Sequence, residues 1–301
     1  MAELTLCVGA TGAQGGSVAR SLLRAGSRVR ALTRNPTALA ARRLAALGAS
    51  VEQGDLSDLA RLTELMEGCD SAFGVTSYWE HFGNEIAHGK NLVDAAVQAK
   101  LSHLVLSTLP SPERLSRGRM FVPHMESKAA IETYARNSPL CCSFVHVAFQ
   151  FENFGGWFAP RVDRDGVLSI GFPCGEAPLA GVAIDDLGPV VVRIIRERAR
   201  FRGETVAVVG DELRGEQLAA ELSRGLGQEV RYTLEACEAS AQLPTGAARE
   251  LAAMFAFERR FAPSRRVEIE ATRALFPGAQ RFSTWVTRQS ERLRSALGLS
   301  D

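Results

Sequence analysis

The sequence predicts an α/β fold in which helices cover both faces of a parallel sheet. Short apolar runs alternate six times with stretches of helical periodicity through the first half of the chain. A glycine-rich turn, Gly9 to Gly15, follows the first apolar run and opens the first helical stretch. With 301 residues, 46% of them hydrophobic, the chain is long enough for this sheet and a further lobe. We therefore expect a Rossmann-type, doubly wound parallel sheet with a smaller α/β C-terminal lobe.

The strands of the first half are short runs of apolar or alternating residues that lie between turn residues. In one of them, residues 28–33, basic and apolar side chains alternate. Six such runs predict six strands, over residues 4–8, 28–33, 50–53, 71–75, 103–107 and 142–147.

Helical periodicity fills the stretches between these strands. Val18, Leu22 and Leu23 share one face of the first helix. Pro36 favours the start of the second helix, and Gly48 favours its end. The predicted helices cover residues 14–24, 36–47, 57–66, 91–98 and 125–136. Ligands of doubly wound sheets bind beyond the carboxyl ends of the strands, so functional residues are expected there.

The pattern is less regular after about residue 150. We expect a nucleotide-binding domain over residues 1–150. Residues 151–301 are expected to form a smaller lobe that is interleaved with it and lies on the substrate or partner side. Its phenylalanines, such as Phe149 and Phe172, fit either a packed core or an apolar pocket. The predicted elements are a strand at 205–209 and helices from Asp185 or Asp186 to 198 and over 213–226, 247–257 and 283–297.

Composition excludes several classes of protein. The 35 basic and 34 acidic residues give a net charge of +1, so the basic excess typical of nucleic-acid-binding proteins is absent. No apolar run approaches the roughly 18 residues of a membrane-spanning helix. The first residues lack the basic segment of a signal peptide. We expect a cytoplasmic protein that binds neither nucleic acid nor a membrane.

The cysteines and histidines indicate neither disulfides nor a metal. The six cysteines form no Cys-x-x-Cys pair, and Cys7 and Cys142 stand in apolar runs, so reduced thiols are expected. The five histidines make no metal-ligand spacing, so we expect no metal site.

Gly9 to Gly15 has the pattern G-x-x-G-x-x-G between a predicted strand and a predicted helix. Glycine allows the backbone to turn tightly and to approach a pyrophosphate. The free N–H groups of the helix N-terminus then attract the phosphates. The pattern alone is weak, but its position between strand and helix favours a dinucleotide site over an ordinary turn.

The residues after the second predicted strand favour NADP(H) over NAD(H). A site for NAD(H) places an acid about 20 residues after the glycines to bind the ribose 2′-OH. This chain has no Asp or Glu between Glu3 and Glu52, and Arg34 stands where that acid would be. A guanidinium pairs with a 2′-phosphate. The alternative is a solvated loop arginine in an arginine-rich chain. Asp55 and Leu56, after the third strand, are placed to flank the adenine.

The catalytic pattern of short-chain dehydrogenases is incomplete. That chemistry uses a tyrosine proton donor with a lysine four residues later. No Tyr-x-x-x-Lys occurs, but His124 precedes Lys128 by four residues. Lys128 is a candidate ligand of the nicotinamide ribose, and the alternative is a solvated lysine on a helix. His124 is a candidate proton donor, and the alternative is a capping or surface histidine at the start of a helix. Ser107, at the end of the fifth strand, is a candidate substrate hydrogen-bond donor, and Tyr78 or water could supply the proton instead.

Together these residues resemble the NmrA-like family of atypical short-chain dehydrogenases. The resemblance is carried by segments 12–20, 33–36 and 75–80, which includes Tyr78-Trp-Glu80, by His124 with Lys128, and by segments 151–153 and 186–190. It implies a redox-sensing role in which the NADPH/NADP ratio changes conformation, association and the binding of partner proteins. The resemblance implies that NADP(H) is held by Gly9, Ala10, Thr11, Gly12, Ala13, Gln14, Gly15, Arg34, Asn35, Pro36, Asp55, Leu56, Thr76, Ser77, Tyr78, Lys128, Phe151, Glu152 and Asn153.

Two functions therefore stay open. The first is an NADP(H)-binding redox sensor and regulator, because the cofactor loop is intact while the catalytic tyrosine is missing. The second is an NADPH-dependent reductase of a small carbonyl, imine or activated alkene, because Lys128 and His124 are present. A regulatory protein, an apolar small-molecule substrate and a homodimer are the partners that these interpretations allow.

Overall fold

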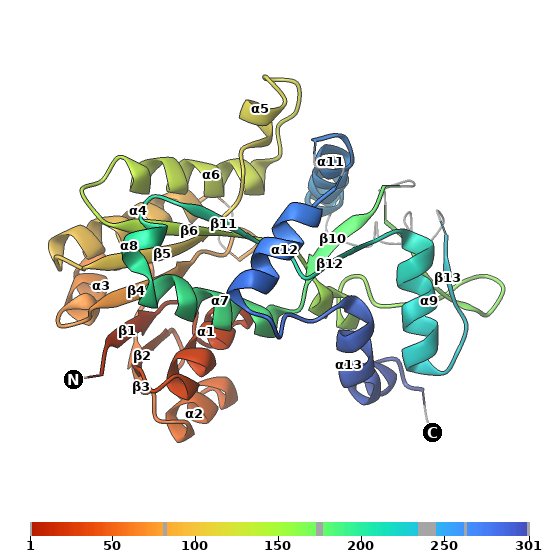
Figure 1. The fold of residues 1–301 in the computed structure, drawn as a ribbon, viewed down its shortest axis with the longest axis horizontal. Helices are drawn as coiled ribbons and strands as arrows, with labels where there is room; N and C mark the ends of the chain where they lie inside the picture. Colours follow the sequence, from red (N-terminus) through yellow and green to blue (C-terminus); the bar gives the residue numbers. More distant parts are fainter. Residues whose placement is uncertain (1, 81–82, 173–176, 234–244, 262–263, 300–301) are drawn as a thin grey trace. The chain divides into compact units, whose positions relative to one another are not determined.

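The computed structural model describes residues 2–80, 83–172, 177–233, 245–261 and 264–299 (Figure 1). The chain forms two compact units. The first comprises residues 1–111, 124–147 and 184–208, and the second comprises residues 112–123, 148–183 and 209–301. The chain thus enters the second unit at residues 112, 148 and 209, and it returns to the first unit at residues 124 and 184.

A seven-stranded parallel sheet forms the centre of the first unit. Its strand order is β11-β6-β5-β4-β1-β2-β3, so the direction of winding reverses at β1, as in a doubly wound sheet. This confirms the predicted fold class, and the six strands expected in the first half agree with those observed to within one residue at each end. The strands are β1 (Leu4–Cys7), β2 (Arg28–Thr33), β3 (Ser50–Gln53), β4 (Ser71–Val75), β5 (His103–Thr108), β6 (Cys142–Val147) and β11 (Thr205–Val208).

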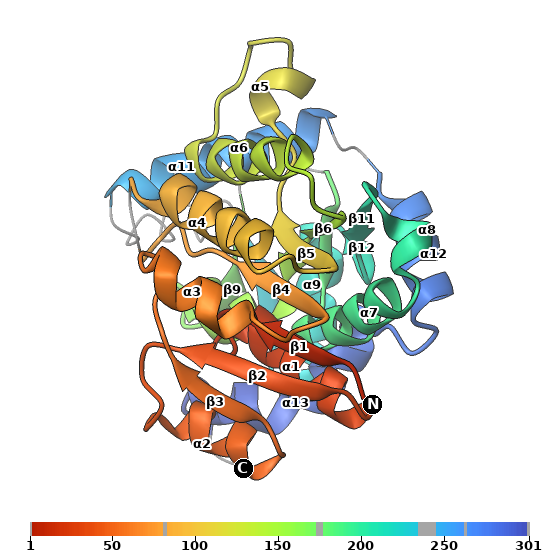
Figure 2. The same cartoon turned by 90° about the vertical axis from the view of Figure 1, so that its left-hand side faces the viewer.

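Helices cover both faces of this sheet. Three helices, α3, α4 and α6, share one apolar cluster with strand residues such as Leu6, Leu104 and Phe144 (Figure 2). Alternate strand residues point to the opposite face, where α1 and α7 pack on the sheet and on each other. The helices of this unit are α1 (Ala13–Arg24), α2 (Leu39–Ala46), α3 (Leu59–Met66), α4 (Glu85–Gln98), α6 (Pro123–Arg136), α7 (Ile184–Arg196) and α8 (Arg198–Phe201).

Helix α4 starts at Glu85, six residues before the predicted start at 91. The early turns carry His88 and Gly89, which show no apolar periodicity. Gly89 is nevertheless buried, because Ile131 of α6 occupies the space that a side chain would need. Packing of α4 on α6 thus explains the early start of the helix, and the apolar pattern of residues 85–90 gives no sign of this packing.

The second unit is built around aromatic side chains. Five phenylalanine rings form a connected cluster in which each ring centroid lies 5.1–6.3 Å from at least two others; they are Phe149, Phe154, Phe158, Phe172 and Phe255. Of the two alternatives for these phenylalanines, the structure supports the packed core. The elements are α5 (Pro112–Leu115), β7 (Phe149–Gln150), the 3-10 helix η1 (Phe151–Gly155), β8 (Arg161–Val162), β9 (Leu168–Ile170), β10 (Leu179–Val182), β12 (Asp211–Leu213), α9 (Gly215–Leu226), β13 (Val230–Tyr232), α11 (Thr245–Phe261), α12 (Arg266–Leu275) and α13 (Phe282–Ala296).

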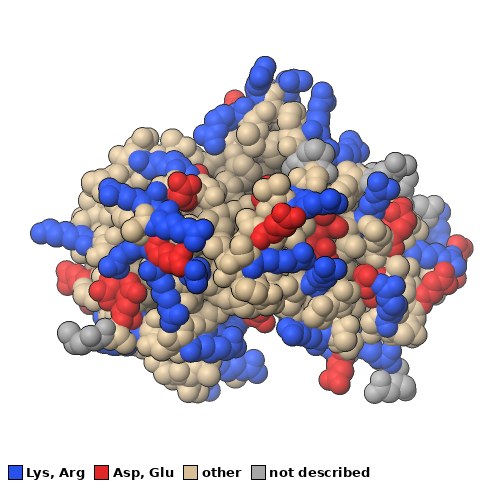
Figure 3. Space-filling view, in the orientation of Figure 1, with Lys and Arg blue, Asp and Glu red and all other residues tan. Residues whose placement is uncertain are grey.

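Two small sheets complete the second unit, in the orders β12-β10-β7 and β13-β9-β8. Helix α12 was not among the predicted elements, whereas α9, α11 and α13 overlap the predicted helices. No helix within the described residues is long and apolar enough to cross a membrane. Basic and acidic side chains are interspersed over most of the face shown in Figure 3, as the balanced charge predicts.

Four described cysteines, Cys7, Cys69, Cys141 and Cys142, are free thiols. Burial raises the pKa of Cys142 to about 11, and it raises the pKa of Cys7 further. Both therefore behave as small hydrophobic side chains. The other two cysteines, Cys174 and Cys237, lie outside the described residues.

Close packing between α1 and α7 generates a stability prediction. The Gly188 N–H donates to Ser17 Oγ at 3.1 Å. A Cβ at Gly188 would clash with the Ser21 hydroxyl and the Ser17 carbonyl oxygen. We expect Gly188→Ala to lower the free energy of unfolding by about 1–3 kcal/mol, measured by urea denaturation.

The control is Gly155→Ala, where the nearest atom to the added Cβ is Leu293 Cδ2 at 3.6 Å. This variant should stay within about 0.5 kcal/mol of the parent protein. Equal effects of the two substitutions would contradict a tight contact between α1 and α7.

Candidate functional site

A cavity of about 480 Å³ opens at the carboxyl ends of the central strands of the first unit. This is the edge at which doubly wound sheets bind their ligands. The loops after β1, β2, β3 and β4 supply its walls. The lining residues are Val8, Gly9, Thr11, Gly12, Ala13, Gln14, Gly15, Leu32, Thr33, Arg34, Asn35, Ala38, Gly54, Asp55, Leu56, Val75, Thr76, Ser77 and Glu80.

The floor of the cavity is the glycine loop between β1 and α1. Gly9 has a φ of +66°, which favours glycine, and its carbonyl oxygen accepts the Gly12 N–H at 2.9 Å. A Cβ at Gly15 would lie only 2.6 Å from the Val8 carbonyl oxygen, so only glycine permits this approach of α1 to β1.

The N-terminus of α1 is well suited to an anion. Gly12 provides no side-chain cap, and no acidic residue lies in the first turn. Its first N–H groups and its positive dipole end therefore face the cavity without a carboxylate to neutralise them. A pyrophosphate fits this chemistry.

Polar side chains form the wall beyond β2 and β3. The Asn35 carboxamide accepts hydrogen bonds from the Thr37 N–H and hydroxyl, at 3.0 and 2.7 Å, which fixes the turn after Arg34. Asp55 accepts the hydroxyl and the N–H of Ser57, and these bonds lower the pKa of Asp55. The carboxylate thus stays ionised beside the cavity.

Arg34 lies on the rim of the same wall. Its Nη2 atom is 2.7 Å from Oε2 of Glu80, which follows β4. Both side chains are more than half exposed, at 56% and 57%. The cavity therefore holds the predicted arginine and also a carboxylate from a distant part of the sequence.

Ser107 connects the end of β5 to the glycine loop. Its hydroxyl donates to Oε1 of Gln14 at 2.7 Å, and its side chain is buried. Two residues predicted for different roles are thus brought together, and the hydroxyl proton of Ser107 is directed to Gln14.

Lys128 lies in a buried ion pair. Its Nζ donates to Glu85 Oε1 at 2.6 Å, to the Thr76 carbonyl oxygen at 2.9 Å and to Thr76 Oγ1 at 3.1 Å. Glu85 also accepts hydrogen bonds from the hydroxyls of Thr76 and Ser127. Burial lowers the pKa of Lys128, and the attraction of Glu85 opposes that shift. An ammonium has three N–H donors, and here all three have protein acceptors.

Three aromatic rings meet near the start of α6. The ring centroids of Tyr78 and His124 are 6.0 Å apart, and Trp79 is 5.4 Å from His124. His124 is buried, with 6% of its surface exposed. Both predicted proton donors, Tyr78 and His124, therefore lie in one aromatic cluster.

The residues predicted at 151–153 belong to the second unit. Phe151 packs there against Phe282 and Trp285, with ring centroids 5.0 and 5.8 Å apart. Glu152 accepts the indole N–H of Trp285 at 3.0 Å, and the Asn153 carbonyl oxygen accepts the Gly156 N–H. Their predicted contact with a cofactor stays a prediction.

The cavity collects twelve of the predicted cofactor-binding residues and omits others. Ala10 is buried, and Pro36, Tyr78 and Lys128 do not line the cavity. Glu80 and Glu85 were not among the predicted site residues, although Glu80 stands in the Tyr-Trp-Glu segment that carries the family resemblance. The twelve predicted residues that line the cavity are Gly9, Thr11, Gly12, Ala13, Gln14, Gly15, Arg34, Asn35, Asp55, Leu56, Thr76 and Ser77.

Among the described residues, no three His, Cys, Asp or Glu side chains lie close enough together to hold a metal ion.

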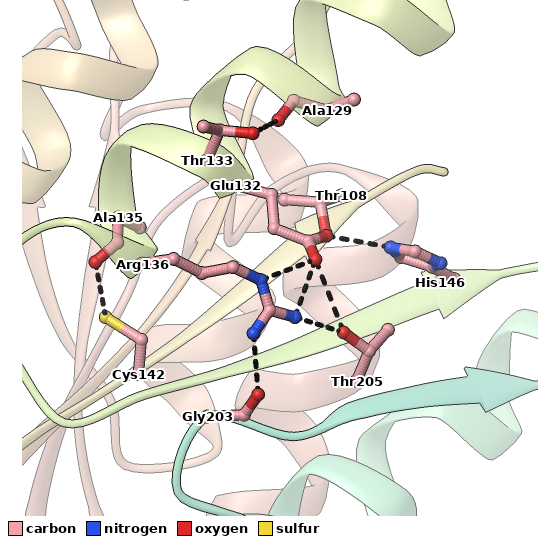
Figure 4. Close-up of polar contacts among 10 residues, drawn as sticks. All are labelled: Thr108, Ala129, Glu132, Thr133, Ala135, Arg136, Cys142, His146, Gly203 and Thr205. Carbon is pink, nitrogen blue, oxygen red and sulfur yellow. Dashed lines mark hydrogen bonds and ion pairs between the residues drawn. The ribbon is translucent and has the colours of Figure 1, made fainter. Parts of the chain in front are cut away.

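A second charged cluster holds the other end of α6. Figure 4 shows Glu132 among side chains from three strands. It accepts hydrogen bonds from Thr108 at 2.6 Å and Arg136 at 2.7 Å, and His146 Nε2 lies 2.8 Å from its Oε2. Burial alone would raise the pKa of Glu132, but the bonds from His146, Thr108 and Arg136 outweigh it and lower the pKa to about 2. Arg136 in turn donates to Thr205 Oγ1 at 2.6 Å, which ties α6 to β11.

Comparison with known proteins identifies the family of the chain and several relatives. The sequence model of the NmrA-like family matches residues 1–285. The NmrA-like family domain-containing oxidoreductase hkm9 of Aspergillus hancockii is 35% identical over 249 residues, which cover 76% of this chain and 74% of that protein. An NmrA-like family domain-containing protein of Dictyostelium discoideum is 31% identical over 242 residues, with coverages of 77% and 80%.

Solved structures match the whole chain. The crystal structure of NmrA, a negative transcriptional regulator, in complex with NADP is 25% identical and superimposes with a TM-score of 0.85. A structure of the same regulator in complex with NAD is 26% identical, also with a TM-score of 0.85. Each covers 100% of this chain and 99% of the regulator.

Because Lys128 and Glu85 form a buried pair, we expect Glu85→Gln to have opposite effects on the free energy of unfolding in the parent protein and in a Lys128→Met variant. Lys128→Met leaves the Glu85 carboxylate buried without its cation, and we expect a loss of about 3–5 kcal/mol in the free energy of unfolding. Glu85→Gln should destabilise the parent protein but stabilise the Lys128→Met variant, because there it removes an unpaired buried charge. Urea denaturation of the four proteins measures both effects. A Glu85→Gln effect of the same sign in both backgrounds would contradict the ion pair.

Glu132 predicts a pH dependence of stability. Its folded pKa of about 2 lies below the ordinary 4.5. The carboxylate therefore stabilises the fold fully above about pH 5, and this contribution is lost as the pH falls towards 2. The full contribution is about 2–3 kcal/mol, and Glu132→Gln should flatten the fall of unfolding free energy between pH 5 and 2.5. Glu64→Gln removes an exposed carboxylate and serves as the control. Parallel pH profiles for the parent and Glu132→Gln would refute the assignment.

Proposed function

The chain belongs to the NmrA-like family, and from this premise we propose that it is an NADP(H)-binding redox sensor that regulates a protein partner. Three features support the proposal. The cavity is lined by a glycine loop and an uncapped helix N-terminus. Arg34 lies on its rim. NmrA, a regulator of the same fold, has been crystallised with NADP and with NAD.

The residues of the cavity form three groups, one for each part of a bound dinucleotide: the pyrophosphate, the adenosine 2′-phosphate and the nicotinamide half. Gly9 to Gly15 and the N-terminus of α1 would hold the pyrophosphate. Arg34 would pair with the 2′-phosphate, and Asp55 and Leu56 would flank the adenosine. Thr76 and Ser77, after β4, would face the nicotinamide half. These residues would bind and orient the cofactor, and bound NADPH would supply a hydride only if the protein acts as a reductase.

One observation favours a sensor: the Lys128 ammonium already has three protein acceptors for its three N–H donors. In the short-chain dehydrogenase pattern this lysine binds the ribose and lowers the pKa of a tyrosine four residues earlier. Here histidine replaces that tyrosine, and all three donors of Lys128 are directed to Thr76 and Glu85. Lys128 would thus act on the cofactor through Thr76, whose position it fixes, and a direct bond to the ribose would require it to leave one acceptor.

An NADPH-dependent reductase is the second candidate. Relatives such as hkm9 are named oxidoreductases. Tyr78 lies in one aromatic cluster with the buried His124, so a group able to donate a proton is present beside the segment that lines the cavity. The substrate would be a small carbonyl, imine or activated alkene. A cytoplasmic location and a homodimer are consistent with either function, and the buried free thiols suit a reducing compartment.

Titration calorimetry with NADP⁺, NADPH and NAD⁺, followed by NADPH absorbance with ketones, aldehydes, cyclic imines and enones, tests the proposal. We expect binding of NADP(H) without turnover. Arg34→Glu should weaken NADP⁺ binding at least about tenfold, since it replaces a charge-assisted hydrogen bond by repulsion, while NAD⁺ binding changes less.

The outcomes separate the two functions. Turnover above background with any substrate would establish the reductase, and His124→Phe would then test the proton donor. Failure to bind any of the three nucleotides would refute both functions. A pull-down that recovers different partners with NADPH and with NADP⁺ would support the sensor directly.

A further inference from the structure

The ion pair between Arg34 and Glu80 lies on the rim of the cofactor cavity. The Nη2–Oε2 distance is 2.7 Å, and both residues belong to the lining. They are 46 residues apart in sequence and follow different strands, β2 and β4. The carboxylate thus contacts the guanidinium that the proposed function assigns to the 2′-phosphate.

A carboxylate at this position affects the two nicotinamide cofactors in opposite ways. It occupies a donor of Arg34 and repels the 2′-phosphate of NADP(H), which carries the same sign of charge. The ribose of NAD(H) has a neutral 2′-OH, which an acidic side chain accepts in NAD sites. The chain has no acid at the end of β2 to play this role, but Glu80 brings one to the same rim from the segment after β4.

We propose that Glu80 is a specificity-determining residue of the cofactor cavity: it competes with the 2′-phosphate for Arg34 and so limits the preference for NADP(H) over NAD(H). The inference rests on the proposed binding of NADP(H). Arg34 provides the attraction for the phosphate, and Glu80 sets how much of that attraction is available.

The size of the effect follows from the exposure of the pair. Both side chains are more than half exposed, so solvent screens their attraction. Exposed ion pairs are weak, and releasing Arg34 from one should tighten phosphate binding about two- to fivefold. The effect is thus measurable but leaves Arg34 as the main determinant.

The test compares Glu80→Gln with Glu64→Gln by titration calorimetry of the full chain with NADP⁺ and NAD⁺. Glu64 is an exposed partner of Arg61 at 2.7 Å and does not line the cavity, so its substitution removes the same charge elsewhere on the first unit. We expect Glu80→Gln to lower the Kd for NADP⁺ two- to fivefold relative to Glu64→Gln, with no tightening of NAD⁺. In an Arg34→Gln background the gain should be smaller, because the competition is for Arg34.

Three results would overturn the inference. An NADP⁺ affinity of Glu80→Gln equal to that of Glu64→Gln would show that the carboxylate does not compete, while the proposed function would stand. Equal tightening of NADP⁺ and NAD⁺ would show a general charge effect without specificity. A parent protein that binds neither nucleotide would refute the proposed function and the inference together.

Discussion

The approach of the α1 backbone to β1 is the constraint on which the rest of the first unit depends. At Gly15 the helix lies so close to Val8 and Gly9 that no side chain fits, and this places the first turn of α1 at the carboxyl edge of the sheet. The same helix is held from the other side, where Gly188 of α7 reaches Ser17 through a backbone N–H. Gly15 towards β1 and Gly188 of α7 thus fix the distance of α1 from the sheet, and with it the position of its positively polarised N-terminus. The glycine loop and the uncapped helix N-terminus at the floor of the cavity both follow from that placement.

Buried charge then determines how α6 sits on the sheet. Lys128 joins the helix to Thr76 at the end of β4 and to Glu85 at the start of α4, while Glu132, one turn later, joins it to β5 and β6 (Figure 4). Such pairs contribute less to stability than their Coulomb attraction suggests, because both partners lose hydration. They do penalise every other register strongly, since a shifted helix would leave charges buried and unpaired. The helix that carries His124 is therefore fixed by polar contacts at two points along its length, and the apolar contacts of Ile131 fill the space between them.

Much of this architecture was predictable because its signals are local. Most strands of the parallel sheet are short runs of apolar or alternating residues, and the glycine loop, Arg34 and Asp55 follow strands closely, where topology alone brings them to one edge. The rest depends on contacts between distant residues. Glu80 meets Arg34 across 46 positions and Glu85 meets Lys128 across 43, and no periodicity reports such pairs. Helix α4 begins early because Gly89 receives Ile131, which the sequence around Gly89 does not reveal. The division into units has the same origin, since α7 returns to the first unit to pack on α1 from far along the chain.

That return has a consequence for the order in which the protein can fold during synthesis. Domains made on the ribosome generally fold from the N-terminus as they emerge. Here the first unit lacks α7 and β11 until residue 208 has been made, after residues 112–123 and 148–183 of the second unit have already been made. A nascent chain ending near residue 150 would therefore expose the face of α1 with Ser17 and Ser21, on which Gly188 later packs, and the outer edge of β6, with which β11 later pairs. Open strand edges of this kind favour aggregation. The growing chain therefore needs protection from aggregation until residue 208 has been made, and not only until the first six strands have formed. Because its residues come from three separate stretches of the chain, the first unit cannot be obtained by truncating the chain at a single point.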